Sequence, residues 1–316
     1  MINRSKAVDL LRNNNNFSIL THKSPDGDTL GSAYALCHIL QDIGKNARVL
    51  VCGEMPKRYD YLRENIIEND FLEEYIVSVD IAADSLLGQL ESYIGKINLC
   101  IDHHPSNTLT ADNILIEGDS AATAEIIYEL AKLLGVKITK DIAKCIFTGV
   151  TTDTGCFRFA NTTAKTHRVA ADMIDAGCDG TYINRVMFDT KSRSRLEIER
   201  MARETMKFFV DGQCAVIYTT LEMIEKANAI DDDMEGISSI PRQVEGVSVG
   251  ITMREQEDGS YKVSVRTSDG VNASQICQKF DGGGHQGAAG CTVEGGLEEA
   301  RAKLVAAAEE IIKNNK

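Results

Sequence analysis

The chain has 316 residues, of which 43% are hydrophobic and 26% charged, and its formal net charge is −13. This length allows two domains of ordinary size, and the composition supports a packed core rather than a disordered chain. No apolar run approaches the ~20 residues that a membrane-spanning helix needs. The first residues also lack the apolar segment of a secretory signal. We therefore expect a cytoplasmic protein without a membrane segment.

The cysteines and the charge exclude further classes. Nine cysteines are scattered singly and form no C-x-x-C pair, which disfavours a disulfide framework or a zinc ribbon. Proteins that hold long nucleic acid show a basic face, whereas residues 206–316 alone carry 11 basic and 18 acidic side chains. We expect no long duplex DNA as a partner. A nucleic-acid ligand would have to be short, or held by metal and a few basic groups.

The first half of the chain alternates strand-like and helix-like segments. Near-continuous apolar strands that alternate with helices are typical of a parallel α/β sheet covered on both faces. The expected strands are 17–21, 47–52, 75–81 and 97–101, and the expected helices are 30–43, 121–134, 140–149 and 163–176.

A stretch rich in helix formers, residues 182–209, predicts a linking helix. We expect its basic cluster to form a solvated face, with contact to phosphate as the alternative. A smaller α/β region follows, with a hairpin turn at 257–260. The expected strands there are 214–219, 247–254 and 261–266, and the expected helices are 273–280 and 297–312. The predicted domains are 1–187 and 208–316, joined by a linker at 188–207.

The first motif that can carry chemistry is His22-Lys23-Ser24-Pro25-Asp26-Gly27-Asp28. It lies between an apolar strand and a helix, at the carboxyl edge of the sheet, where ligands bind in parallel α/β folds. One imidazole and two carboxylates share this turn. The alternative is an Asx turn in which Asp28 caps the next helix.

Three further segments place acids or histidines in similar positions. Asp80 ends the third predicted strand, Asp102-His103-His104 ends the fourth, and Asp153 follows a helix. Asp84, four residues later, is the alternative to Asp80 as the acid that this strand end contributes to a site. Adjacent histidines at a strand end are unusual for packing, because they would point to opposite sides.

Carboxylates with imidazoles, and no thiolate at a suitable spacing, favour a moderately hard divalent ion such as Mn²⁺, with other divalent ions as alternatives. So many acids at one sheet edge would repel each other unless cations neutralised them. Two ions about 3.5–4 Å apart, bridged by one carboxylate, would account for the number of acids and histidines at this edge. Such ions would activate water for phosphate-ester hydrolysis.

The second region contains its own candidate site. Three consecutive glycines, Gly282, Gly283 and Gly284, precede His285 and allow main-chain N–H groups to cradle a phosphate. The alternative is a flexible turn. Arg266, at the end of a strand, could clamp a terminal phosphate with its planar guanidinium.

Taken in order, these motifs resemble those of the DHH phosphoesterases, and the glycine-rich segment with Arg266 resembles the DHH-associated domain of RecJ-like nucleases. The resemblance implies an α/β fold of two domains, joined by a linking helix, with the active site in the cleft between them. It is nearest to the stand-alone oligoribonuclease and pAp phosphatase members of the family.

The resemblance also implies a role for each residue. The first metal ion would bind His22 and Asp26, the second would bind Asp28, His103 and Asp153, and Asp80 would bridge both. His104 would contact the scissile phosphate, and Asp102 would orient the histidines. Arg266, Gly282, Gly283, Gly284 and His285 would bind substrate.

The expected function is therefore Mn²⁺-dependent hydrolysis of short single-stranded oligoribonucleotides to nucleoside 5′-monophosphates, and removal of the 3′-phosphate of pAp. Alternatives are a phosphodiesterase of linear dinucleotides such as pApA, a pyrophosphatase or polyphosphatase, and a catalytically inactive nucleotide sensor. The exposed apolar helix faces would permit a homodimer.

Overall fold

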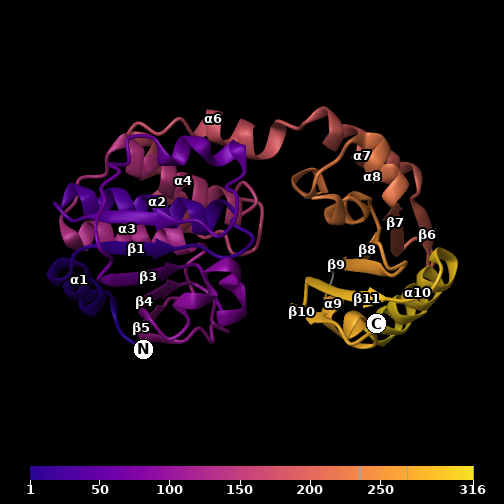
Figure 1. The fold of residues 1–316 in the computed structure, drawn as a ribbon. Helices are drawn as coiled ribbons and strands as arrows, with labels where there is room; N and C mark the ends of the chain where they lie inside the picture. The colour runs from indigo at the N-terminus through magenta and orange to yellow at the C-terminus, as the bar shows by residue number, and fades with distance from the viewer. Residues whose placement is uncertain (235, 269, 316) are drawn as a thin grey trace. The chain divides into compact units, whose positions relative to one another are not determined.

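The computed structural model describes residues 1–234, 236–268 and 270–315. It divides the chain into two compact units, Met1–Thr190 and Lys191–Lys316. Each unit contains one sheet and its own apolar core (Figure 1). None of the described helices combines the length and the apolar character that crossing a bilayer requires.

The sheet of the first unit is entirely parallel, in the order β2-β1-β3-β4-β5 (Figure 1). This confirms the predicted parallel α/β fold. The sequence did not predict β5, because this edge strand is mostly half-buried and its apolar run is only three residues long, after Asp112 and Asn113. The strands are β1 (Phe17–Leu20), β2 (Ala47–Leu50), β3 (Tyr75–Val79), β4 (Ile97–Asp102) and β5 (Ala111–Ile116).

The two faces of this sheet are covered differently. One face packs in a single apolar cluster to which all six α-helices of the unit contribute. The other face packs against loops and short 3₁₀ helices in a smaller cluster. The helices of the unit are α1 (Arg4–Asn13), α2 (Gly27–Asp42), α3 (Thr123–Leu134), α4 (Lys140–Asp153), α5 (Ala164–Asp175) and α6 (Gly180–Asn184), with η1 (Lys57–Arg63), η2 (Asp84–Leu86), η3 (Gly88–Tyr93) and a π-helical turn, η4 (Arg185–Asp189).

The predicted continuous linking helix is wrong. The chain leaves helical geometry at Thr190, and a new helix, α7 (Arg193–Glu204), begins after Ser192. The hydroxyl of Ser192 accepts the N–H of Arg195 and so caps α7. The last residues of the predicted helix form strand β6 (Lys207–Phe209) instead. Two basic residues of α7 pair with glutamates of the same helix: Arg195 with Glu199, and Arg200 with Glu197 and Glu204.

The second unit has a mixed sheet in the order β10-β11-β9-β8-β7-β6, in which only β7 and β8 are parallel. The predicted hairpin at 257–260 joins β8 to β9, and the two strands pair antiparallel. The strands are β7 (Cys214–Thr219), β8 (Val249–Glu255), β9 (Tyr261–Thr267), β10 (Gly283–Gly284) and β11 (Ala288–Val293); the helices are α8 (Leu221–Ala227), α9 (Ala273–Gln278) and α10 (Leu297–Asn314), with η5 (Asp231–Met234), η6 (Ile237–Ser239) and η7 (Pro241–Gln243).

One face of this mixed sheet packs against α9 and α10. On the opposite face, Ile217 of β7 packs against residues of α7, α8 and η6. Along β9, however, this second face carries Lys262, Ser264 and Arg266, which are exposed or half-buried. The second face is therefore apolar and covered at β7, and polar at β9.

Candidate active site

Three adjacent strands of the first unit deliver the predicted site residues to one edge of the sheet. His22 lies two residues after β1, Asp80 directly follows β3, and Asp102 is the last residue of β4. These strands are neighbours in the sheet and run parallel, so their carboxyl ends meet at one edge. The strand order reverses between β1 and β3, which is where α/β folds of this kind bind ligands.

The turn after β1 positions two more carboxylates. Asp26 is the N-cap of α2, and its Oδ1 accepts the N–H groups of Asp28 (3.0 Å) and Thr29 (3.1 Å). Asp28 is buried in the first turn of α2, and its carboxylate instead accepts the N–H groups of Thr123 (2.7 Å) and Ala124 (3.0 Å). The alternative in which Asp28 caps its own helix is therefore wrong: Asp26 caps α2, and Asp28 caps α3.

Asp80 lies between two histidines. Its Oδ2 is 3.9 Å from Nε2 of His22, and its Oδ1 is 3.6 Å from Nε2 of His103. The alternative acid, Asp84, accepts hydrogen bonds from the N–H and hydroxyl of Thr110 in an exposed loop. Of the two acids, the structure thus brings Asp80 to the histidines.

The remaining predicted ligands close the same cluster. Nε2 of His22 is 3.6 Å from Oδ1 of Asp26, and Nε2 of His103 is 3.6 Å from Oδ2 of Asp153. Asp153 is the last residue of α4, rather than a residue beyond the helix as predicted. In three groups, the nitrogen and oxygen atoms lie within 4.8 Å of one another: His22, Asp26 and Asp80; Asp28, His103 and Asp153; Asp80, His103 and His104.

The two adjacent histidines are oriented through their Nδ1 atoms. Nδ1 of His103 lies 3.1 Å from the carbonyl of Ser120, and Nδ1 of His104 lies 2.8 Å from Oδ1 of Asp102. A ring N–H that donates to an oxygen leaves Nε2 free to bind a cation or a substrate. The Nδ1 of His104 is also 3.7 Å from Asp80. Because that nitrogen donates to Asp102, the geometry disfavours His104 as a ligand through Nδ1.

Several residues that the sequence did not single out support this cluster. Asn107 donates through Nδ2 to Oδ2 of the fully buried Asp102, and the hydroxyl of Thr123 donates to Oδ1 of Asp80. Ser120 fixes the ring of His103 through its carbonyl. These are common polar residues in loops or at the start of a helix. They belong to no sequence motif that would have identified them as part of the site.

The backbone of Asp80 adopts a left-handed conformation, with φ of 59°. Such a conformation is uncommon for a residue other than glycine, although aspartate tolerates it better than most. It is held in place by a hydrogen bond from the Asp80 N–H to the carbonyl of Ile101 (3.0 Å). Strained backbone of this kind collects at functional sites.

The acids of this cluster repel one another. Burial, and then the nearby Asp28 and Asp26, raise the pKa of Asp80 well above its usual range and the pKa of Asp153 to about 8. By contrast, the hydrogen bond that His104 donates to Asp102 raises the pKa of His104 and keeps its ring cationic to higher pH. Carboxylates that are costly to ionise together, with imidazole nitrogens facing them, match the donor set of a divalent cation.

The predicted substrate residues of the second unit lie around β10. Gly283 and Gly284 form that strand, which pairs with β11, and His285 is exposed directly after it. A side chain at Gly282 would place its Cβ 2.3 Å from the carbonyl oxygen of Gly290, and one at Gly284 would meet the carbonyl of Ala288 at 2.6 Å. Packing therefore requires these two glycines. A Cβ at Gly283 would meet no atom within 4 Å, so only Gly283 lacks a packing reason to be glycine.

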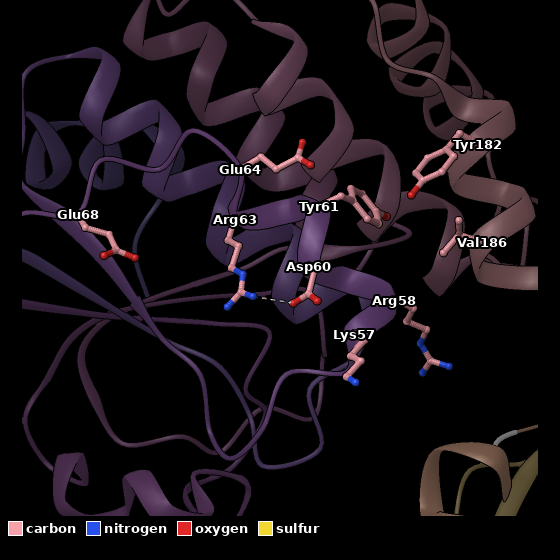
Figure 2. A pocket seen from close by; sticks show the side chains of 9 residues that line it. All are labelled: Lys57, Arg58, Asp60, Tyr61, Arg63, Glu64, Glu68, Tyr182 and Val186. Atoms are coloured by element: carbon pink, nitrogen blue, oxygen red, sulfur yellow. Dashed lines mark ion pairs between the residues drawn. The ribbon is translucent and has the colours of Figure 1, made fainter. Parts of the chain in front are cut away.

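A separate pocket of about 590 Å³ opens on the first unit (Figure 2). None of the predicted site residues lines it. Its charged side chains partly neutralise one another, as in the ion pair between Arg63 and Asp60 (Figure 2). The pocket is lined by Lys57, Arg58, Asp60, Tyr61, Arg63, Glu64, Glu68, Tyr182 and Val186.

Comparison with known proteins defines the class. Residues 16–150 match the N-terminal domain of the DHH family, and residues 213–314 match the DHHA1 domain. Together with the parallel sheet and the cluster of acids and histidines, these matches show that the chain belongs to the DHH family of phosphoesterases, with a C-terminal DHHA1 domain.

Particular relatives span nearly the whole chain. The bifunctional oligoribonuclease and PAP phosphatase NrnA of Thermus thermophilus is 35% identical over 301 residues, which cover 92% of this chain and 89% of that protein. An exopolyphosphatase-related protein of Bacteroides fragilis has a crystal structure that superposes with a TM-score of 0.89 at 25% identity, covering 99% of this chain and 97% of that one. The structure of the exonuclease RecJ bound to manganese shares the fold, with a TM-score of 0.57 at 12% identity, covering 96% of this chain and 94% of that one.

Proposed function

We propose that this protein is a two-cation phosphoesterase that hydrolyses short oligoribonucleotides to nucleoside 5′-monophosphates and removes the 3′-phosphate of pAp. The observation that carries the proposal is the position of Asp80, whose two oxygens face His22 and His103 separately. A carboxylate between two sets of ligands is the arrangement that two adjacent cations require.

The residues fit two divalent cations. His22 and Asp26 would hold one cation, Asp28, His103 and Asp153 would hold the other, and Asp80 would contact both. Nitrogen and oxygen donors without thiolates favour Mn²⁺ among the divalent ions. Such cations supply charge stabilisation at the phosphoryl group and make water more acidic.

The other residues of the cluster prepare the site for a phosphate. Asp102 holds the Nδ1–H of His104, so that Nε2 of His104 points away from Asp102 and can donate to a phosphate oxygen. The raised pKa of His104 favours the protonated ring that this donation needs. Asn107 fixes the orientation of the Asp102 carboxylate by donating a hydrogen bond to its second oxygen, Oδ2.

The substrate class rests on the relatives and on the second unit. The relative from Thermus thermophilus is named as an oligoribonuclease and PAP phosphatase, and a short ligand agrees with the acidic balance of residues 206–316. Arg266, Gly283 and His285 are the candidates for holding the ligand in the second unit. Linear dinucleotides such as pApA belong to the same substrate class.

The test is product analysis with purified protein, first stripped of cations by a chelator. A labelled short RNA, pAp and pyrophosphate are each incubated with Mn²⁺, and the release of mononucleotide and of phosphate is measured. We expect hydrolysis of the RNA and of pAp, none without a divalent cation, and little release from pyrophosphate. Preferred cleavage of pyrophosphate would replace the proposal with the pyrophosphatase alternative, and tight binding of pAp without any cleavage would favour the sensor alternative.

A further inference from the structure

Two arginines of the second unit meet on the polar part of its sheet. Arg266 of β9 pairs directly with Gly250 of β8. A side chain at Gly250 would place its Cβ 3.0 Å from the backbone nitrogen of Arg242 and 3.1 Å from Cβ of Pro241. Directly opposed residues of an antiparallel pair project from the same face. The segment at 241–242 therefore lies on the face from which Arg266 projects.

Neither arginine has an anionic partner among the residues that the structure describes. Arg266 is half-buried, and its one hydrogen bond runs from a terminal guanidinium nitrogen, Nη1, to the carbonyl of the adjacent Val265 (3.2 Å). Arg242 is exposed and forms no ion pair with a described residue. Burial, and then the positive charge of Arg242, lower the pKa of Arg266.

Several other arginines of this unit do form ion pairs with carboxylates. Arg254 contacts Asp231 at 2.7 Å, and Arg195 contacts Glu199 at 3.3 Å. Residues 206–316 contain 18 acidic side chains, so carboxylates are plentiful. No described carboxylate pairs with Arg242 or Arg266, and the two positive charges repel each other. An anion bound between them would remove that repulsion.

The glycine-rich segment lies near Arg266 on the other side of β9, next to β11. The second neighbour of Arg266 is Ala288 of β11. The carbonyl of Ala288 accepts the N–H of His285 at 2.8 Å. One row of paired positions therefore crosses three strands: Gly250 on β8, Arg266 on β9 and Ala288 on β11. Arg242 lies next to one end of this row, and His285 is hydrogen-bonded at the other end.

We propose that Arg242 joins Arg266 in a binding site for the terminal phosphomonoester of a nucleotide, and so selects phosphorylated over unphosphorylated short substrates. This inference rests on the proposed function and assigns a specificity role to a residue outside the motifs of the site. A phosphomonoester carries a charge of about −1.5 to −2 at neutral pH, and guanidinium groups bind its oxygens in pairs. A chain end without phosphate offers no such charge.

The test is a binding measurement on the full chain in chelator, where no hydrolysis occurs. Titration calorimetry with pApA, with ApA and with inorganic phosphate is performed on the wild type, Arg242→Gln and Arg242→Lys. We expect the wild type to prefer pApA to ApA about tenfold or more, and Arg242→Gln to lose about tenfold in pApA affinity, as for a hydrogen bond to a charged group. The affinity for ApA should not change, and Arg242→Lys should recover part of the loss.

Arg200→Gln is the matched control, because it removes the same charge from an exposed arginine of this unit that already pairs with Glu197 and Glu204. It should bind pApA as the wild type does. An equal loss of pApA and ApA affinity in Arg242→Gln, or no loss, overturns the inference. Inorganic phosphate that binds as tightly as pApA also overturns it, since the site would then not recognise a nucleotide. The binding assay decides these points even if product analysis refutes the proposed hydrolysis.

Discussion

Among the described residues, each of the two units gathers side chains of like charge, acidic in the first unit and basic in the second. In the first unit, Asp28, Asp80 and Asp153 lie together without a lysine or arginine among the described groups around them. In the second unit, Arg242 and Arg266 are near enough for the charge of Arg242 to lower the pKa of Arg266, and neither pairs with a carboxylate of the described residues. Uncompensated charge is costly in a folded protein. This is the basis on which we propose a ligand of opposite charge for each cluster, a divalent cation for the first and a phosphate for the second.

The largest expected effect comes from Asp80→Asn, which tests the acidic cluster. We expect turnover of pAp to fall about 10³-fold, because the carboxylate between the two ligand sets is lost. The melting temperature in chelator should rise at the same time, since the substitution removes a buried charge that its neighbours repel. Kinetics and thermal melting measure the two effects on the same preparation.

Asp84→Asn is the matched control for Asp80→Asn, because Asp84 only binds Thr110 in a loop. It should keep turnover within about twofold of the wild type, as is usual for a surface change away from the site. A similar loss of turnover in both variants would contradict the role given to Asp80.

The next effect concerns pH. The pKa of Asp153 is about 8 in the folded protein and about 4 in the unfolded chain. Between these values the native state holds more protons than the unfolded state, so stability in chelator should fall as pH rises from about 4 to 8. A bound cation must displace the same proton, so the affinity for Mn²⁺ should rise about tenfold per pH unit, or about a hundredfold from pH 6 to pH 8.

Calorimetric titration of Mn²⁺ in buffers of different ionisation enthalpy would count the released protons, and thermal melting in chelator would follow stability. An affinity for Mn²⁺ that does not change between pH 6 and 8 would show that Asp153 is already ionised in the cation-free protein.

A smaller loss is expected for Asp102→Asn, which tests the orientation of the histidines. We expect turnover to fall about 10- to 100-fold, the usual cost of removing a partner of a functional imidazole. The alkaline limb of the pH profile should move to lower pH, because Asp102 raises the pKa of His104. If the losses from Asp102→Asn and His104→Gln multiply in the double variant, the two residues act independently, contrary to this explanation.

The smallest expected effect is a change in KM, and it distinguishes a glycine that contacts ligand from one that is needed for packing. Gly283→Ala should leave the melting temperature unchanged and raise the KM for pAp about threefold, if a ligand approaches the backbone there. Gly282→Ala should instead destabilise the protein by about 1–3 kcal/mol, because its Cβ would overlap Gly290. Unchanged KM in a stable Gly283→Ala variant would favour the alternative of a simple turn.

Much of the fold could be predicted because local pattern and tertiary structure agree. The apolar runs at β1, β3 and β4 became buried parallel strands, and the predicted strand 214–219 coincides with β7. The prediction was wrong where the pattern was ambiguous. A run of helix formers gave no sign of the break at Thr190, after which the hydroxyl of Ser192 caps the start of α7. The edge strand β5 lacked the apolar run of its neighbours.

The apolar runs alone were enough to place His22, Asp80 and Asp102 at strand ends, because the carboxyl ends of parallel strands share one edge of a sheet. The contacts of each side chain at that edge could be read only from the packed molecule. Packing turned the oxygens of Asp80 toward two different histidines, gave Asp28 to the start of α3, and brought Arg242 beside Arg266 across Gly250. The reason is physical: spacing along a chain fixes the direction and the face of a side chain, whereas distances between segments far apart in sequence depend on how the elements pack.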